Sequence, residues 1–150
     1  MARILLVDDD EMVRSTVRAM LAGAGHEVVQ AVDGEDGLLQ FRQHGCDLII
    51  CDVIMPNMDG LEMVREIRRL STDVPIISMT GSFVRSTGGA HLNAVYLRLC
   101  SELGATKVIA KPFRAADLMP LVVQCLGLSP VHALGAALVA RLPTLPAEVG

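Results

Sequence analysis

Side chains that can bind metal ions or phosphate stand at the ends of several apolar segments in this 150-residue sequence. An acidic run begins at Asp8, a single carboxylate stands at Asp52, and a hydroxyl and an ammonium group follow at Thr80 and Lys111. A carboxylate can attack phosphorus when nearby positive charge neutralises the phosphoryl oxygens. These residue types therefore indicate phosphoryl transfer, provided that the fold brings them together.

Each of these residues also has an ordinary structural interpretation. Asp9 or Asp10 could be the N-cap of the helix that follows, and Asp59 is typical of a turn because glycine comes next. Thr80 could simply end a strand, and Lys111 could belong to a loop. The chemical interpretation therefore depends on their convergence.

Short apolar segments alternate with longer amphipathic ones along most of the chain. We expect strands at Arg3–Val7, Glu27–Ala31, Asp47–Cys51, Pro75–Met79 and around Val108–Ala110. We expect helices at about Glu11–Ala22, Gly34–His44, 61–70 and Ala115–Leu126, with a further one ending near Leu103. Such alternation predicts a parallel sheet with helices on both faces. Functional groups gather at the carboxyl ends of such strands, which is where the residues of interest stand.

Clustered carboxylates repel one another, and the repulsion is costly unless a cation joins them. A small divalent ion with oxygen ligands, most simply Mg²⁺, removes that cost. One carboxylate is then free to attack phosphorus, while the metal ion, the lysine and the hydroxyl neutralise the oxygens of the phosphoryl group. The pattern thus predicts Mg²⁺-dependent phosphoryl chemistry at one edge of the sheet.

Four segments closely resemble the receiver domains of two-component response regulators, of the chemotaxis-regulator kind. They read ILLVDDD from Ile4, DLIICDVIMPNMDG from Asp47, MTG from Met79 and AKPF from Ala110. The resemblance extends over about Ala2–Leu126. It implies an α/β fold of the flavodoxin-like type, a doubly wound five-stranded parallel sheet with strand order 2-1-3-4-5.

The resemblance also assigns roles to individual residues. Asp52 is the expected phosphoacceptor, with Thr80 and Lys111 bound to oxygens of the phosphoryl group. The expected Mg²⁺ ligands are Asp8 (through water), Asp9, Asp52 and the backbone carbonyl of Ile54. The Lys111-Pro112 peptide bond is expected to be cis.

A receiver of this kind takes its phosphoryl group from a sensor histidine kinase or a histidine phosphotransfer protein, and a downstream protein partner reads the resulting change of conformation. It is a phosphoacceptor rather than an enzyme. Two alternatives stay open: a non-phosphorylated pseudo-receiver that binds a partner constitutively, and a receiver that is one part of a longer regulator. A phosphatase of the haloacid-dehalogenase type is disfavoured because Ile54 occupies the place of its second aspartate. A flavodoxin-type flavin site is disfavoured because acidic residues replace its phosphate-binding loop.

Composition limits the location and the partners. The net charge of −4 and the isoelectric point near 5.5 argue against direct nucleic-acid binding. No apolar run has the length of a signal peptide or membrane span. The four cysteines show no metal-binding spacing and are expected to be reduced thiols. We therefore expect a cytoplasmic protein.

Three features depart from the receiver pattern. Val108 stands where the family usually has an aromatic residue that moves with the threonine, and Tyr96 is a possible substitute. The segment between Thr80 and Lys111 is long, and residues 82–90 within it are expected to form an enlarged loop. We expect a receiver domain at 1–127 and a tail or linker at 128–150, without a DNA-binding domain. A short helix in that tail could pack on its own domain or on a second copy, so a homodimer stays open.

Overall fold

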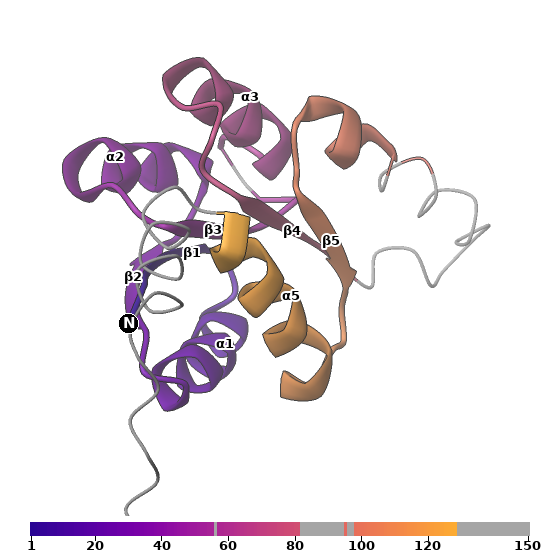
Figure 1. Ribbon diagram of the computed structural model, residues 1–150. Coiled ribbons are helices and arrows are strands. Elements are labelled where there is room, and N and C mark those ends of the chain that lie inside the picture. The colour runs from indigo at the N-terminus through magenta and orange to yellow at the C-terminus, as the bar shows by residue number, and fades with distance from the viewer. Residues whose placement is uncertain (56, 82–94, 96–97, 129–150) are drawn as a thin grey trace, which may run out of the picture.

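The computed structural model describes residues 1–55, 57–81, 95 and 98–128, and these form a parallel five-stranded sheet between two layers of helices (Figure 1). The strands are β1 (Arg3–Val7), β2 (Glu27–Ala31), β3 (Leu48–Asp52), β4 (Ile76–Thr80) and β5 (Lys107–Ala110). The helices are α1 (Glu11–Gly23), α2 (Gly34–His44), α3 (Gly60–Leu70) and α5 (Ala115–Leu128). Residues 95 and 98–103 are also helical. The strand order is β2-β1-β3-β4-β5, as the resemblance implied.

The sheet is held by an apolar core on each of its faces. Side chains of β1, β3 and β4 alternate between the two faces, and almost all of them are buried because helices cover both faces. One core lies beneath α1 and α5, where Val17, Leu21, Leu118 and Val122 contact the sheet. The other lies beneath α2 and α3 and includes Leu38, Met63, Val64 and Ile67. Figure 1 shows these two helical layers.

The strand register brings the chemical residues to one edge. Val7, the last residue of β1, lies between Ala31 of β2 and Cys51 of β3, so Asp8 leaves the sheet where Asp52 ends the neighbouring strand. On the other side, β4 ends at Thr80, which pairs with Ala110 of β5. The sequence predicted this convergence, although it ended β3 and β4 one residue too early.

Three aspartates begin three of the helices. Asp10 caps α1 by accepting hydrogen bonds from the backbone of Met12 and Val13, Asp33 caps α2, and Asp59 caps α3. Each carboxylate satisfies amide groups that have no partner inside the helix. The structural interpretation is therefore right for Asp10 and Asp59, whereas Asp9 is not the cap.

Some of the remaining sequence predictions concern described residues, and others do not. The Lys111-Pro112 bond is cis, as expected. All four cysteines are free thiols, and burial raises the pKa of Cys51 and of Cys46 to about 12. No helix of the described residues is long and apolar enough to cross a membrane. Tyr96, the 82–90 loop and the tail from residue 129 lie outside the described residues.

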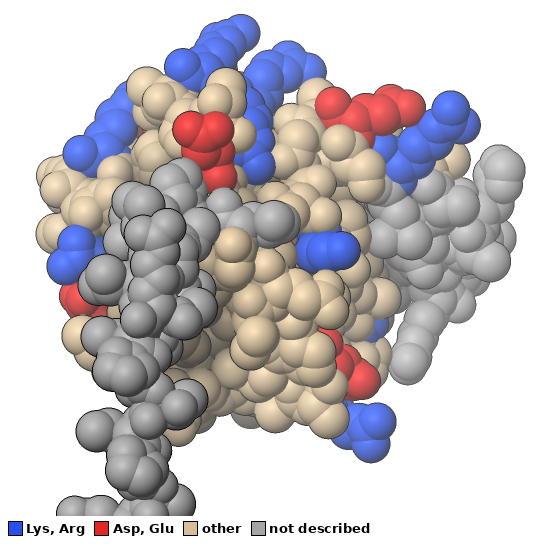
Figure 2. Space-filling view, viewed as in Figure 1, with Lys and Arg blue, Asp and Glu red and all other residues tan. Residues whose placement is uncertain are grey.

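Figure 2 shows how charged and uncharged side chains are distributed over one face of the molecule. On the face drawn in Figure 2, uncharged side chains cover most of α5, and lysine and arginine side chains are spread around the rim. Val123 of α5 is 67% exposed. The described part of this face thus presents a largely uncharged surface over α5.

Gly60 gives a stability test of the turn behind Asp52. A side chain at this position would collide with the backbone oxygen of Asp52. We expect Gly60→Ala to lower the free energy of unfolding by about 2 kcal/mol or more, because the backbone must move. Urea denaturation measures the change. Gly23→Ala in α1 is the control, because no atom lies within 4 Å of the added carbon, and it should be neutral or slightly stabilising. Equal effects of the two variants would contradict this packing.

Candidate phosphoacceptor and metal site

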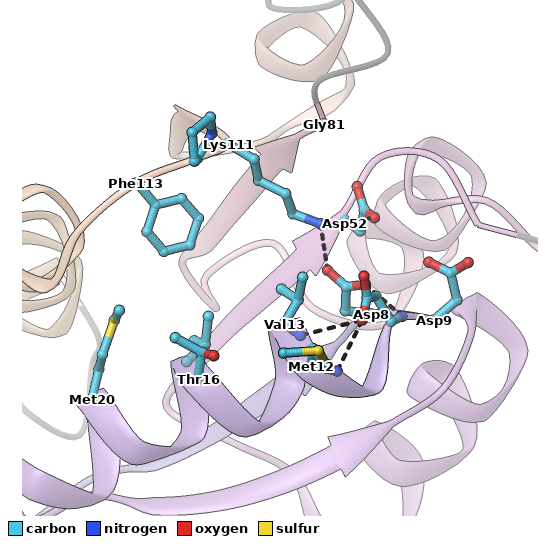
Figure 3. A pocket seen from close by; sticks show the side chains of 13 residues that line it. Asp8, Asp9, Met12, Val13, Thr16, Met20, Asp52, Gly81, Lys111 and Phe113 are labelled. Atoms are coloured by element: carbon cyan, nitrogen blue, oxygen red, sulfur yellow. Dashed lines mark hydrogen bonds and ion pairs between the residues drawn. The ribbon is translucent and has the colours of Figure 1, made fainter.

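The centre of the site is an ammonium group shared by two carboxylates (Figure 3). Lys111 Nζ lies 2.6 Å from Asp8 Oδ2 and 3.1 Å from Asp52 Oδ2. Asp8 is completely buried and Asp52 is 6% exposed. Contacts of this kind inside a protein are stronger than on its surface because water screens them less. The three residues come from β1, β3 and the segment after β5, so their contact requires the whole sheet.

The two carboxylates differ in their remaining partners. Asp8 Oδ1 accepts a hydrogen bond from the Asp10 backbone N–H at 2.8 Å, so each of its oxygens has a donor. The backbone oxygen of Asp8 also accepts a bond from Arg14 at 2.7 Å. Sequence reasoning missed Arg14, whose only signal is its position in the first turns of the helix after the acidic run. Asp8 is therefore held firmly in place.

Burial and charge set the protonation of the pair. Burial, together with the charge of Asp8, raises the pKa of Asp52 above its ordinary value despite the attraction of Lys111. Burial also opposes the charge on Lys111, but the hydrogen bond and charge of Asp8 and the charge of Asp52 outweigh it and raise the pKa of Lys111. The lysine thus stays charged, and Asp52 is a carboxylate whose ionisation is costly.

A third carboxylate completes an oxygen-rich cluster. Oxygen atoms of Asp8, Asp9 and Asp52 lie within 4.8 Å of one another. Asp9 is exposed, and Figure 3 shows its side chain beside the other two. Three carboxylates against one lysine leave excess negative charge, which a cation would neutralise. An all-oxygen set with an accessible side suits Mg²⁺, which keeps several waters when it binds to proteins. The residues therefore fit the expected metal ion.

The other two predicted site residues lie nearby with different partners. The Ile54 backbone N–H lies beside the Asp52 carboxylate, where it opposes the rise in the pKa of Asp52, and the Ile54 side chain is 44% exposed. Thr80 is buried, and its Oγ1 donates to the backbone oxygen of Ile109 at 3.4 Å. This hydroxyl points to β5 rather than into the cavity. Val108, opposite Ser78 in the register, is half-buried.

The site opens into a cavity of about 600 Å³. One end holds the acidic residues and Lys111, and the walls beyond are mostly apolar. Those walls come from α1 and the segment after β5, and they include Met12, Val13, Thr16, Met20 and Phe113 (Figure 3). The cavity is open to solvent, so molecules in solution can reach the carboxylates.

The sequence of this chain matches a known protein family. The sequence profile of the response regulator receiver domain matches residues 4–123. The transcriptional regulatory protein AfsQ1 of Streptomyces coelicolor is 42% identical over 118 residues, which cover 79% of this chain and 48% of that protein. The probable transcriptional regulator ycf27 of Pyropia yezoensis is 37% identical over 117 residues, 77% of this chain and 44% of that protein. The chain thus spans about half the length of these relatives.

Solved structures share the fold. A putative response regulator from Chloroflexus aurantiacus superimposes with a TM-score of 0.75 at 31% identity, covering 84% of this chain and 98% of that one. The chemotaxis response regulator CheY4 of Vibrio cholerae gives 0.71 at 31% identity, covering 83% and 98%. These structures match nearly end to end, which supports a receiver unit within this chain.

The raised pKa of Asp52 predicts an effect on stability in the absence of metal ions. The folded protein holds a proton on Asp52 more tightly than the unfolded chain does, so ionisation costs stability at pH 7. That cost disappears as the pH falls through the folded pKa. We expect Asp52→Asn to raise the free energy of unfolding in EDTA at pH 7, on the order of 1 kcal/mol, with a smaller gain near pH 4.

Urea denaturation at both pH values measures this difference. Asp59→Asn is the matched control, because it makes the same change of charge at an exposed helix cap that asparagine also satisfies. An Asp52→Asn protein less stable than wild type at pH 7 would mean that attraction to Lys111 outweighs burial.

Proposed function

Because this chain belongs to the response regulator receiver domain family, we propose that it accepts a phosphoryl group on Asp52. The donor is a phosphohistidine of a sensor histidine kinase or a histidine phosphotransfer protein. The reaction requires Mg²⁺, and a protein partner reads the phosphorylated state. The observation that carries the proposal is Lys111 Nζ between the buried carboxylates of Asp8 and Asp52, with Asp9 beside them.

The chemistry follows from the differences among the carboxylates. An oxygen of Asp52 attacks phosphorus, an acyl-phosphate bond forms, the phosphorus–nitrogen bond of the donor breaks, and its electron pair returns to the imidazole. Lys111, already 3.1 Å from Asp52, is placed to pair with a phosphoryl oxygen. Asp8, Asp9, Asp52 and the Ile54 carbonyl would hold Mg²⁺, which when bound supplies positive charge to the phosphoryl oxygens.

The signal begins with the charge that phosphorylation adds at the ends of the strands. The hydrogen bond from Thr80 to Ile109 is long at 3.4 Å, so the hydroxyl gives it up readily for a phosphoryl oxygen. That exchange pulls the end of β4 toward Asp52 and biases the adjoining helices between two arrangements. With Val108 in β5, the change proceeds without the aromatic residue usual in the family.

The proposal gives the protein the role of a phosphoacceptor rather than of an enzyme. Its partners are the phosphodonor and a downstream protein. We also propose a cytoplasmic location, which free cysteines favour.

Intact mass after incubation with phosphoramidate or acetyl phosphate tests the proposal. We expect a Mg²⁺-dependent mass increase of one phosphoryl group in wild type and none in Asp52→Asn. Lys111→Arg should lower the extent sharply while keeping the charge, because a guanidinium cannot reproduce the two short contacts of one ammonium. A wild-type protein without an adduct from either donor or from a phosphorylated phosphotransfer protein would favour the pseudo-receiver alternative.

A further inference from the structure

The loop between β3 and α3 controls the immediate surroundings of Asp52. The Ile54 backbone N–H lies beside the Asp52 carboxylate and opposes the rise in its pKa, and the Ile54 carbonyl is the proposed metal ligand. Both groups belong to one residue of a segment without regular structure, whose described part is 53–55 and 57–59. Their placement depends on whatever fixes the loop, because the Ile54 side chain is too exposed to anchor it.

One attachment lies at the base of the loop. The Gly60 N–H donates to the backbone oxygen of Val53 at 2.8 Å, which closes the loop into a narrow turn. This bond joins the two ends of the loop, and in its middle Met55 is buried in the core beneath α2 and α3. Hydrogen bonds of residues 57 and 58 to another element add a second attachment.

The second attachment is a pair of hydrogen bonds to the start of α2, which we call the loop latch. Asn57 Nδ2 donates to Asp33 Oδ2 at 2.9 Å, and the Gly34 N–H donates to the backbone oxygen of Met58 at 3.0 Å. A Cβ atom at Gly34 would lie 2.5 Å from that oxygen, so the close approach requires glycine. The latch therefore ties the loop to a helix whose start precedes it by more than twenty residues.

Features other than their mutual hydrogen bond favour the positions of Asp33 and Asn57 in the loop latch. Asp33 is the N-cap of α2, where Oδ1 accepts the Asp36 N–H at 2.8 Å and leaves Oδ2 for Asn57. The bonds from Asp36 and Asn57 lower the pKa of Asp33, so it stays ionised. Asn57 has a φ of 63°, a conformation that asparagine adopts more easily than most residues.

We propose that Asp33 and Asn57 are positioning residues for phosphorylation: their hydrogen bond holds the β3–α3 loop so that Ile54 reaches both Asp52 and the metal ion. This inference rests on the proposed function. If the loop latch were purely structural, its loss would destabilise the fold without changing Mg²⁺ binding or the phosphorylation rate.

Exchange of the donor and acceptor separates the two roles. Asn57→Asp removes the donor and sets two carboxylates against each other. In the double variant Asp33→Asn/Asn57→Asp, the new amide at position 33 donates to the new carboxylate at position 57, and asparagine still caps α2. Gln43→Glu adds the same charge on the exposed surface of α2 and is the matched control.

Four readouts are measured on the full chain: Mg²⁺ affinity by calorimetry, the initial rate of phosphorylation by phosphoramidate, the Ile54 amide signal in NMR spectra of the metal-free protein, and stability to urea. We expect Asn57→Asp to shift the Ile54 signal and to weaken Mg²⁺ binding and the rate by about tenfold each. Added negative charge alone would tighten Mg²⁺ binding, as expected for Gln43→Glu, so the sign of the effect is diagnostic. The double variant should recover to within about threefold of wild type.

The proposal is overturned if Asn57→Asp lowers stability to urea while Mg²⁺ affinity and the Ile54 signal match wild type, or if the double variant recovers neither. The same two measurements decide the proposal even in a protein that takes up no phosphate, in which case the proposed function fails by itself.

Discussion

The placement of like charges at one edge of the sheet is the constraint on which the rest of the structure depends. Asp8 is completely buried and Asp52 nearly so, and their repulsion is relieved by one lysine from beyond β5. The arrangement persists because the apolar strands β1, β3 and β4 bring the carboxylates together whatever their charge. Core burial thus supplies the free energy that holds an electrostatically unfavourable site in place.

Three chemically identical side chains become different through their surroundings. Asp8 has a donor on each oxygen, Asp9 lies open to solvent, and Asp52 shares Lys111 with Asp8. Asp8, with both oxygens bonded, is suited to orienting its neighbours, and the exposed Asp9 is suited to binding a metal ion. Asp52, whose ionisation is costly, is suited to nucleophilic attack. The roles proposed for the three aspartates follow from these different surroundings and not from residue type.

Much of the fold was predictable because the spacing of apolar residues along the sequence indicates which side chains are buried. The buried strands and the strand order follow from apolar patterns and the resemblance, and so does the convergence of Asp8, Asp52 and Lys111. The Asp33–Asn57 bond was not predictable, because capping alone explains an aspartate before a helix. No sequence pattern indicates which group binds the second carboxylate oxygen. Arg14 was missed for a similar reason, since an arginine on an amphipathic helix usually faces solvent. The hydroxyl direction of Thr80 depends on β5 geometry that no pattern encodes.

Chemical mapping of the phosphorylated residue shows which of the three aspartates accepts the phosphoryl group. The protein is phosphorylated with phosphoramidate and Mg²⁺ and then reduced with borohydride, which converts an aspartyl phosphate to homoserine. The peptides are sequenced by mass spectrometry. We expect homoserine at position 52 and unchanged aspartate at positions 8 and 9. Homoserine at position 8 or 9, or a phosphate stable to borohydride on another residue, would contradict the division of roles among the three carboxylates.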